Sequence, residues 1–184
     1  MNTLACAFAG HDPLRFPFGY DEEDDLCQQI KATLLMQILA LYQNGVTAFY
    51  SDCEPGAPMW GAELVLGLQR RVPNIQLHCV LPYEEQATKW TPQLRNRYFS
   101  IVERSNSEYT LCTHYEHDCY LLCNKYLVNH SNFVLAVYDD DQLVCRMEPV
   151  SHLIAYAKNK NRGIITIHPD TGLLTPITIT QGLK

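Results

Sequence analysis

Short apolar runs alternate with segments of helical periodicity along almost the whole chain, and this alternation limits the fold more than any other feature. The first run, Leu4 to Ala9, is apolar without a break, as in a strand buried on both faces. Between Leu26 and Leu41 the apolar residues instead recur with the spacing of one helix face. Such alternation predicts βαβ units, whose right-handed crossovers require a mostly parallel sheet. We therefore predict an α/β fold, a Rossmann-like three-layer α/β/α sandwich with a mostly parallel central sheet.

The same pattern predicts the remaining elements in alternating order. Further strands are expected at residues 46–50, 75–81, 109–112, 133–138 and 163–168, and further helices at 59–71, 92–104, 120–130 and 149–159. The acidic residues 21–25 are expected in the first turns of the long first helix, which stops at Asn44-Gly45. The segment 171–184 alternates polar and apolar residues, which is typical of an edge strand, a hairpin with the preceding strand, or an arm onto a neighbour.

Length and charge limit the partners of the chain. With 184 residues, 47% of them hydrophobic, and no linker, residues 1–184 are expected to form a single domain. A formal charge of −6, with no basic run longer than Arg70-Arg71, argues against a broad contact with a phosphate backbone, so nucleic acid is not an expected partner. The sequence shows no signal-type or membrane-length apolar stretch, so we expect a cytoplasmic protein without a membrane partner. The cysteines lie largely in apolar runs and are expected to be free thiols.

Residues 50–63 form the stretch where a binding site is most expected. They connect a predicted strand to a predicted helix, and ligands of open α/β sheets lie beyond the carboxyl ends of the strands. A phosphate in such a place needs glycines and free N–H groups at the start of the helix. This loop instead carries Asp52, Glu54 and two prolines. The sequence therefore predicts a binding loop with an unusual chemistry.

The chain lacks the motifs of the common catalytic and cofactor sites. The patterns Gly-x-Ser-x-Gly, Gly-x-Gly-x-x-Gly and the P-loop are absent, so neither a serine triad nor a standard nucleotide cofactor is predicted. Zinc-type ligands occur close together at Cys112, His114, His117, Cys119 and Cys123, but without a paired Cys-x-x-Cys, and we predict structural cysteines and no metal.

Two further loops have open interpretations. His11 follows the first strand and either contacts a ligand, as a phosphate partner or an acid or base, or serves as a turn histidine that bonds the backbone. The acidic residues 139–141 follow the fifth strand, and they form either a solvated turn or a site for a cation or a ribose hydroxyl. The sequence alone leaves both pairs of alternatives open.

Seven motifs occur in a distinctive order: Ala5–His11, Pro17–Glu22, Gly45–Thr47, Met59–Glu63, Val80–Tyr83, Asn124–Val128 and Ala136–Asp139. Together they resemble the YpsA-like family of uncharacterised bacterial proteins. That family belongs to the SLOG superfamily of Rossmann-like domains, which also holds the DprA/Smf and Lonely Guy domains. The resemblance extends from residue 4 to about residue 168, and it implies a SLOG-type Rossmann-like domain and a homodimer.

The chain departs from the family pattern at positions that face the expected pocket. After the second strand the family resembles Ser-Gly-x-x-x-Gly-x-Asp-x-x-x-Ala-Glu, but Asp52 replaces the first Gly and Pro58 replaces the Asp. Asp12 replaces the Arg of a Gly-His-Arg-Pro-like turn, and Cys123 replaces an Arg. Each change removes a group that favours phosphate, because carboxylates repel it and proline has no N–H to donate. The resemblance therefore implies a remodelled or retired phosphate pocket.

The predicted ligand-binding residues are Gly10, His11, Ser51, Gly56, Trp60, Glu63, Tyr83 and Asn124. His11 and Asn124 would supply polar contacts, Gly56 a close approach, and Tyr83 an apolar wall, while Trp60 is assigned either to that wall or to the core.

Three functions follow as hypotheses. The first is a non-catalytic binding or regulatory module for a nucleotide-like small molecule. The second is a hydrolase of nucleotide N-glycosidic bonds, similar to the Lonely Guy enzymes, with Glu63 as its catalytic carboxylate. The third is a protein-interaction scaffold with a vestigial pocket.

Overall fold

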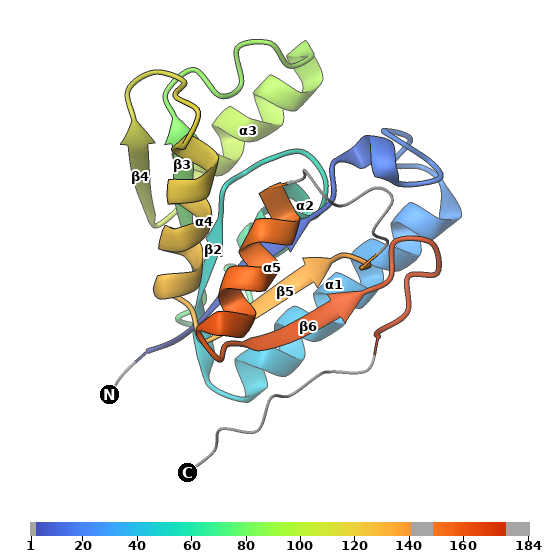
Figure 1. The fold of residues 1–184 in the computed structure, drawn as a ribbon. Helices are drawn as coiled ribbons and strands as arrows, with labels where there is room; N and C mark the ends of the chain where they lie inside the picture. The colour runs from blue at the N-terminus through green and yellow to red at the C-terminus, as the bar shows by residue number, and fades with distance from the viewer. Residues whose placement is uncertain (1–2, 141–148, 176–184) are drawn as a thin grey trace.

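The computed structural model describes residues 3–140 and 149–175, which form a three-layer α/β/α sandwich (Figure 1). Its strands are β1 (Leu4–Gly10), β2 (Val46–Ser51), β3 (Gln76–Tyr83), β4 (Ser107–Cys112), β5 (Phe133–Val137) and β6 (Gly163–Ile167). Its helices are the short η1 (Pro13–Arg15), α1 (Asp25–Gln43), α2 (Ala57–Leu68), α3 (Pro92–Arg104), α4 (Cys119–Asn129) and α5 (Pro149–Asn159). The alternating order predicted from the sequence is confirmed.

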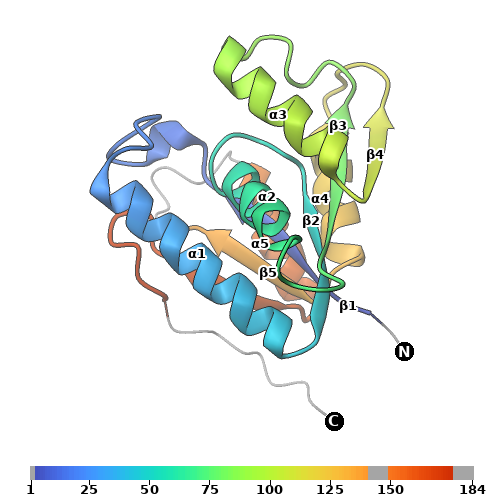
Figure 2. The ribbon, with the colours of Figure 1, turned by 180° about the vertical axis from the view of Figure 1, so that it is seen from behind.

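The six strands of the described residues are all parallel and lie in the order β4-β3-β2-β1-β5-β6. The order reverses beside β1, because the chain moves outward from β1 to β4 and then crosses to β5 on the other side. Right-handed crossovers therefore place α1, α2 and α3 on one face of the sheet and α4 and α5 on the other, as Figures 1 and 2 show from opposite sides. The Rossmann-like, parallel architecture predicted from the alternation is confirmed.

Each face of the sheet has its own hydrophobic core. Ile30, Leu34 and Ile38 of α1 are fully buried and pack with side chains of α2 and α3. On the opposite face, Leu127 of α4 and Leu153 of α5 pack over β1 and β5. The inner strands are buried on both faces, which explains why their sequences are apolar runs rather than alternating patterns. The described cysteines are free thiols, as expected.

The start of α1 differs from the prediction. The helix begins at Asp25, and the side chain of Asp24 caps it by accepting a hydrogen bond from the backbone N–H of Leu26 at 2.8 Å. Only the last of the acidic residues 21–25 therefore lies inside the helix. The prediction was wrong for Asp21, Glu22 and Glu23, which lie in the loop before α1. From that loop the Glu22 carboxylate accepts hydrogen bonds from Lys31 and Arg97.

Strand β3 continues through Pro82, where the sequence predicts that it ends. The pairing of β3 with β2 stops at Cys79, whereas its pairing with β4 continues at Leu81 and Tyr83. Alternate residues of a strand turn their backbone groups to opposite neighbours, so Pro82 faces the side where β2 has already ended. Its missing N–H therefore costs no ladder hydrogen bond.

After β6 the chain turns back on itself. Leu174 forms an antiparallel bridge with Ile167, and the N–H of Thr175 donates to the carbonyl of Thr166 at 2.9 Å. This pairing favours the hairpin among the alternatives for the tail, whose residues 176–184 lie outside the described residues. Among the described helices, none combines the length and the apolar character that crossing a membrane would require.

Helix α2 approaches β1 unusually closely at Gly61. A Cβ at this position would lie 2.6 Å from the ring of Phe8, which is fully buried. Gly61 is therefore required for packing, since the ring is held by the core and has no room to move.

We predict that Gly61→Ala lowers the free energy of unfolding by about 2 kcal/mol, because overpacking displaces Phe8. Gly67→Ala is the matched control in the same helix, since nothing lies within 4 Å of a Cβ there. This control should be neutral or more stable by up to about 1 kcal/mol, because alanine favours the helix. Urea denaturation measures both variants, and equal stabilities would contradict the packing account.

Candidate functional site

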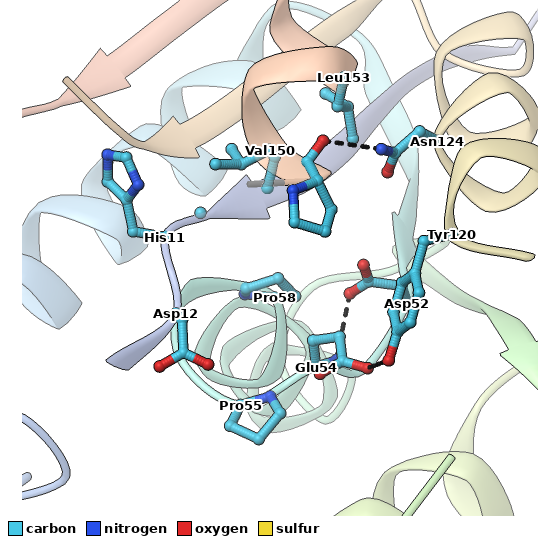
Figure 3. Close-up of a pocket in the computed structure, with 13 residues that line it drawn as sticks. His11, Asp12, Asp52, Glu54, Pro55, Pro58, Tyr120, Asn124, Val150 and Leu153 are labelled. Atoms are coloured by element: carbon cyan, nitrogen blue, oxygen red, sulfur yellow. Dashed lines mark hydrogen bonds between the residues drawn. The ribbon is translucent and has the colours of Figure 1, made fainter. Parts of the chain in front are cut away.

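A pocket of about 310 Å³ opens at the carboxyl edge of the sheet, above the ends of β1 and β2 (Figure 3). It lies between the start of α2 on one face and helices α4 and α5 on the other. Open α/β sheets bind ligands where the strand order reverses, and the order reverses here beside β1. The described lining residues are Ala9, Gly10, His11, Asp12, Asp52, Glu54, Pro55, Pro58, Tyr120, Asn124, Pro149, Val150 and Leu153.

One side of the pocket is a wall of carboxylates formed by Asp12, Asp52 and Glu54. Figure 3 shows the three side chains around the opening, with Val150 and Leu153 across from them. We call this group of three acids the carboxylate wall.

The carboxylate wall is held by hydrogen bonds from neighbouring elements. The Oε1 atom of Glu54 accepts from the hydroxyl of Tyr120 on α4 at 2.9 Å and from Nε2 of Gln86 at 2.7 Å. The same Nε2 donates to the backbone carbonyl of Asp52 at 2.9 Å, and the Asp52 carboxylate accepts from the N–H of Glu54 at 3.1 Å. The side chains of Asp52 and Glu54 therefore have defined positions before any ligand arrives.

Burial makes both acids of the β2–α2 loop weaker than usual. Desolvation raises the pKa of Glu54 to about 7, and the charge of Asp52 adds to this effect, while hydrogen bonds from Gln86 and Tyr120 oppose it. Desolvation likewise raises the pKa of Asp52 to about 6, against backbone hydrogen bonds that lower it. The pair therefore binds or releases a proton near neutral pH.

The described lining residues offer many acceptors and few free donors. They include no lysine or arginine, and Pro55 and Pro58 have no N–H. Two of the side-chain donors are already engaged: the hydroxyl of Tyr120 donates to Glu54, and Nδ2 of Asn124 donates to the carbonyl of Pro149 at 2.8 Å. A ligand that donates hydrogen bonds matches this lining, whereas a phosphate does not.

His11 is held by a second group of residues beside the pocket. Its Nε2 lies 2.8 Å from Oδ1 of Asp139, and its ring stacks on Tyr138 with a centroid distance of 5.0 Å. Arg15 forms ion pairs with both Asp139 and Asp170. His11 is one of the lining residues, but its imidazole is turned away from the carboxylate wall (Figure 3).

Asp139, His168 and Asp170 each offer one potential ligand atom, and these three atoms lie within 4.8 Å of one another, as in some metal sites. Arg15 donates to both of these carboxylates, and its hydrogen bond lowers the pKa of Asp170. The guanidinium therefore already supplies a positive charge there. Of the acidic turn at residues 139–141, Asp141 lies outside the described residues.

The structure brings three of the eight predicted site residues, Gly10, His11 and Asn124, into the lining of the pocket. Two others shape its floor. The hydroxyl of Ser51 donates to the carbonyl of Pro58 at 2.9 Å and is buried. Gly56 caps α2 with a φ of 96°, a conformation that favours glycine, and packs against the backbone of His11.

The remaining three predicted residues lie elsewhere. Trp60 is buried against Phe16 and Phe18, so it belongs to the core, the second of its two assignments. Tyr83 packs edge-on against Tyr120 and is not among the described lining residues. Glu63 does not line the pocket and instead pairs with Arg97 of α3 at 2.7 Å.

Sequence reasoning did not place the carboxylate wall or Tyr120 among the site residues. In the sequence, the acids differed from what a phosphate-binding loop requires, but no sequence pattern indicated that their side chains face the same pocket. Tyr120, Val150 and Leu153 come from helices distant in sequence, and only the crossovers of the sheet bring them to β1.

Comparison with known proteins identifies the family. A family model described as the YspA SLOG family (YpsA) matches residues 6–171. The chain therefore belongs to the YpsA family. A UPF0398 protein of Halalkalibacterium halodurans is 36% identical over 115 residues, which span 61% of this chain and 61% of that relative. The UPF0398 protein YpsA of Bacillus subtilis is 24% identical over 140 residues, covering 74% of this chain and 76% of that protein.

Solved structures share the fold of this YpsA-family chain. DNA processing protein A of Streptococcus pneumoniae matches with a TM-score of 0.58 and 8% identity, over 89% of this chain and 50% of that chain. A structure of DNA processing protein A from Helicobacter pylori, described for its single-stranded DNA binding mode, matches with a TM-score of 0.57 and 14% identity. The match covers 90% of this chain and 65% of that chain. This chain thus spans half to two thirds of the length of these proteins, and at such identities the likeness shows the fold alone.

The raised pKa of Glu54 predicts a specific dependence of stability on pH. Below the usual value of 4.5 the carboxyl is protonated in both states; between 4.5 and about 7 only the folded state keeps the proton. The contribution of Glu54 to stability is therefore complete below pH 4.5 and is lost as the pH rises through 7. Between these limits, the free energy of unfolding should fall by roughly 1 to 3 kcal/mol more in the wild type than in Glu54→Gln.

Chemical denaturation across the pH range measures this difference. Glu103→Gln, at an exposed position of α3, removes one carboxylate outside the pocket and should leave the wild-type pH profile unchanged. Parallel profiles for the wild type and Glu54→Gln would show that the pKa of Glu54 is not raised.

Proposed function

We propose that this protein is a non-catalytic binding or regulatory module that holds a nucleoside-like small molecule in a modified nucleotide-type pocket. The observation that carries the proposal is the polar lining at the carboxyl edge of the sheet, which consists of acceptors and includes the carboxylate wall. The pocket lies where this class of fold binds nucleotides, but its acceptor-rich lining favours ligands that donate hydrogen bonds. Hydroxyl and amino groups of a nucleoside are such donors.

The shape of the pocket supports a ligand with one flat apolar part. Pro58, Val150 and Leu153 line it without offering polar side-chain groups, as the face of a base requires. A volume of about 310 Å³ is at the lower end of the range for small-molecule sites. A nucleoside matches both features.

A phosphate or a nucleic acid backbone is a poor occupant of this site. Asp12, Asp52 and Glu54 would repel it, and no described lysine or arginine of the lining would compensate. Binding of single-stranded DNA by the Helicobacter pylori protein is therefore not transferred to this chain. We propose no further cofactor, and a homodimer stays a prediction.

Affinity for a panel of nucleosides and their 5′-monophosphates tests the proposal. We expect at least one nucleoside to raise the melting temperature and to bind in calorimetry at least as tightly as its monophosphate. Asp12→Arg places a cation at the mouth of the pocket and should improve monophosphate binding about tenfold relative to the nucleoside.

Glu103→Arg makes the same charge change on the exposed face of α3 and is the matched control, with no expected change in preference. If no nucleoside or monophosphate binds to the wild type or to Asp12→Arg, the module hypothesis fails and the scaffold with a vestigial pocket replaces it.

The second candidate is hydrolysis of N-glycosidic bonds, and the position of Glu54 favours it. A carboxyl group with a pKa near 7 inside a pocket suits a general acid that protonates a departing base. Water would add to the anomeric carbon, and the base would leave with the proton. Glu63, which the sequence suggested for this role, lies outside the lining and bonds Arg97.

Release of free base from nucleosides and nucleoside monophosphates, followed by chromatography, tests this candidate. Glu54→Gln should lower the rate at least about 100-fold, the usual contribution of general acid catalysis, while Glu63→Gln should leave it unchanged. Binding without any release of base would exclude the hydrolase and retain the binding module.

A further inference from the structure

From the acceptors around the end of β2 we infer that the pocket recognises the ribose of its ligand, with Asp52 and Glu54 accepting hydrogen bonds from the two vicinal hydroxyls. This inference rests on the proposed function and names the chemical group that the carboxylate wall holds. It assigns to Asp52 and Glu54 a role in telling ribonucleosides from deoxyribonucleosides.

The position of Asp52 is the first support. Asp52 directly follows β2, which ends at Ser51, and its carboxylate lines the pocket. One of its oxygens, Oδ1, accepts from the N–H of Glu54, and its other oxygen receives no hydrogen bond from another described residue. In nucleotide-binding α/β folds an acid at a comparable place accepts from a ribose hydroxyl, which is an analogy of fold and not of sequence.

Glu54 provides the adjacent acceptor. Its Oε1 already accepts from Tyr120 and Gln86, so the direction of the carboxylate is fixed, and no described residue donates to Oε2. A vicinal diol presents two donors on neighbouring carbons, which suits two neighbouring carboxylates that each keep one oxygen available.

The amide of Gln86 is an independent observation at the same wall. The side chain is 3% exposed and donates through Nε2 to both loop residues, yet its Oε1 has no hydrogen-bond partner among the described residues. Buried acceptors of this kind are normally satisfied. Gln86 is not among the described residues that line the pocket, so it supports the two acids through Nε2 and is assigned no contact with the ligand.

Hydroxyl groups fit this wall better than a cation or an anion does. Burial favours the neutral acids, and a protonated carboxyl still accepts a hydrogen bond through its carbonyl oxygen, whereas it no longer attracts a cation. An anion would be repelled whenever either acid is ionised. The recognition of a neutral diol is thus compatible with both protonation states of the pair.

Isothermal calorimetry with adenosine, guanosine, cytidine and uridine, each beside its 2′-deoxy counterpart, tests the inference on the full chain. The ribonucleoside that binds should lose at least about tenfold in affinity when the 2′-hydroxyl is absent, since the acceptors are then left unpaired. Asp52→Ala should reduce the affinity for the ribonucleoside and bring the ratio between the two forms close to one. Glu103→Gln, which removes one exposed carboxylate outside the pocket, should leave the ratio unchanged.

Asp52→Asn serves if Asp52→Ala does not fold, because it keeps the oxygen that accepts from the N–H of Glu54. It should also weaken the preference for ribose, since an amide donor replaces the second acceptor. Equal binding of ribonucleosides and deoxyribonucleosides, or an unchanged preference in both Asp52 variants, would overturn the inference and leave the proposed function standing. Absence of binding by every nucleoside and monophosphate would overturn both the inference and the proposed function. Binding of putrescine in preference to any nucleoside would overturn the inference by showing that the carboxylate wall recognises a cation and not a diol.

Discussion

The close packing of α2 on β1 is the contact on which the rest of this structure depends. Gly61 allows the helix to pack directly on the ring of Phe8. Gly10 allows the end of β1 to approach Ala57, since a Cβ on Gly10 would lie 2.7 Å from the Cβ of Ala57. These two contacts fix the distance between α2 and the sheet and the position of the first turn of α2. Because the β2–α2 loop must reach that starting point, the positions of Asp52 and Glu54 follow from the packing of the core.

The loop itself is held from below as well as from its ends. Ser51 bonds the backbone at Pro58 and at Cys53, and the carbonyl of Glu54 accepts from the N–H of Met59 at 3.1 Å. Cys53 has a φ of 61° and is fully buried, with its sulfur 3.4 Å from that of Cys79. A loop with so many internal bonds presents its acids in one arrangement, which is the condition for selective binding.

Two glutamates show how the surroundings decide the chemistry of one residue type. Burial alone would raise the pKa of Glu22, but hydrogen bonds from Arg97, Lys31 and Trp60 outweigh it and lower the pKa to about 2. Glu54 is also buried but has only neutral donors and the nearby charge of Asp52, so its pKa is raised. Glu22 is therefore a permanent charge that ties α1, α2 and α3 together, whereas Glu54 remains able to exchange a proton in the pocket.

The sequence by itself determined the order of the elements, the parallel sheet and the edge at which a ligand is expected, because apolar periodicity and crossover handedness depend on local pattern. Departures from the family pattern at Asp12, Asp52 and Pro58 also implied a pocket without phosphate-binding features. Only the tertiary structure decided which side chains share the pocket. It brought Tyr120 and α5 to the end of β1, assigned Trp60 to the core rather than to the pocket wall, and placed Glu63 beside Arg97. The physical reason is that the rotation of α2 about its axis is set by packing against Phe8, and a sequence pattern does not record which face of a nearly all-buried helix meets which neighbour.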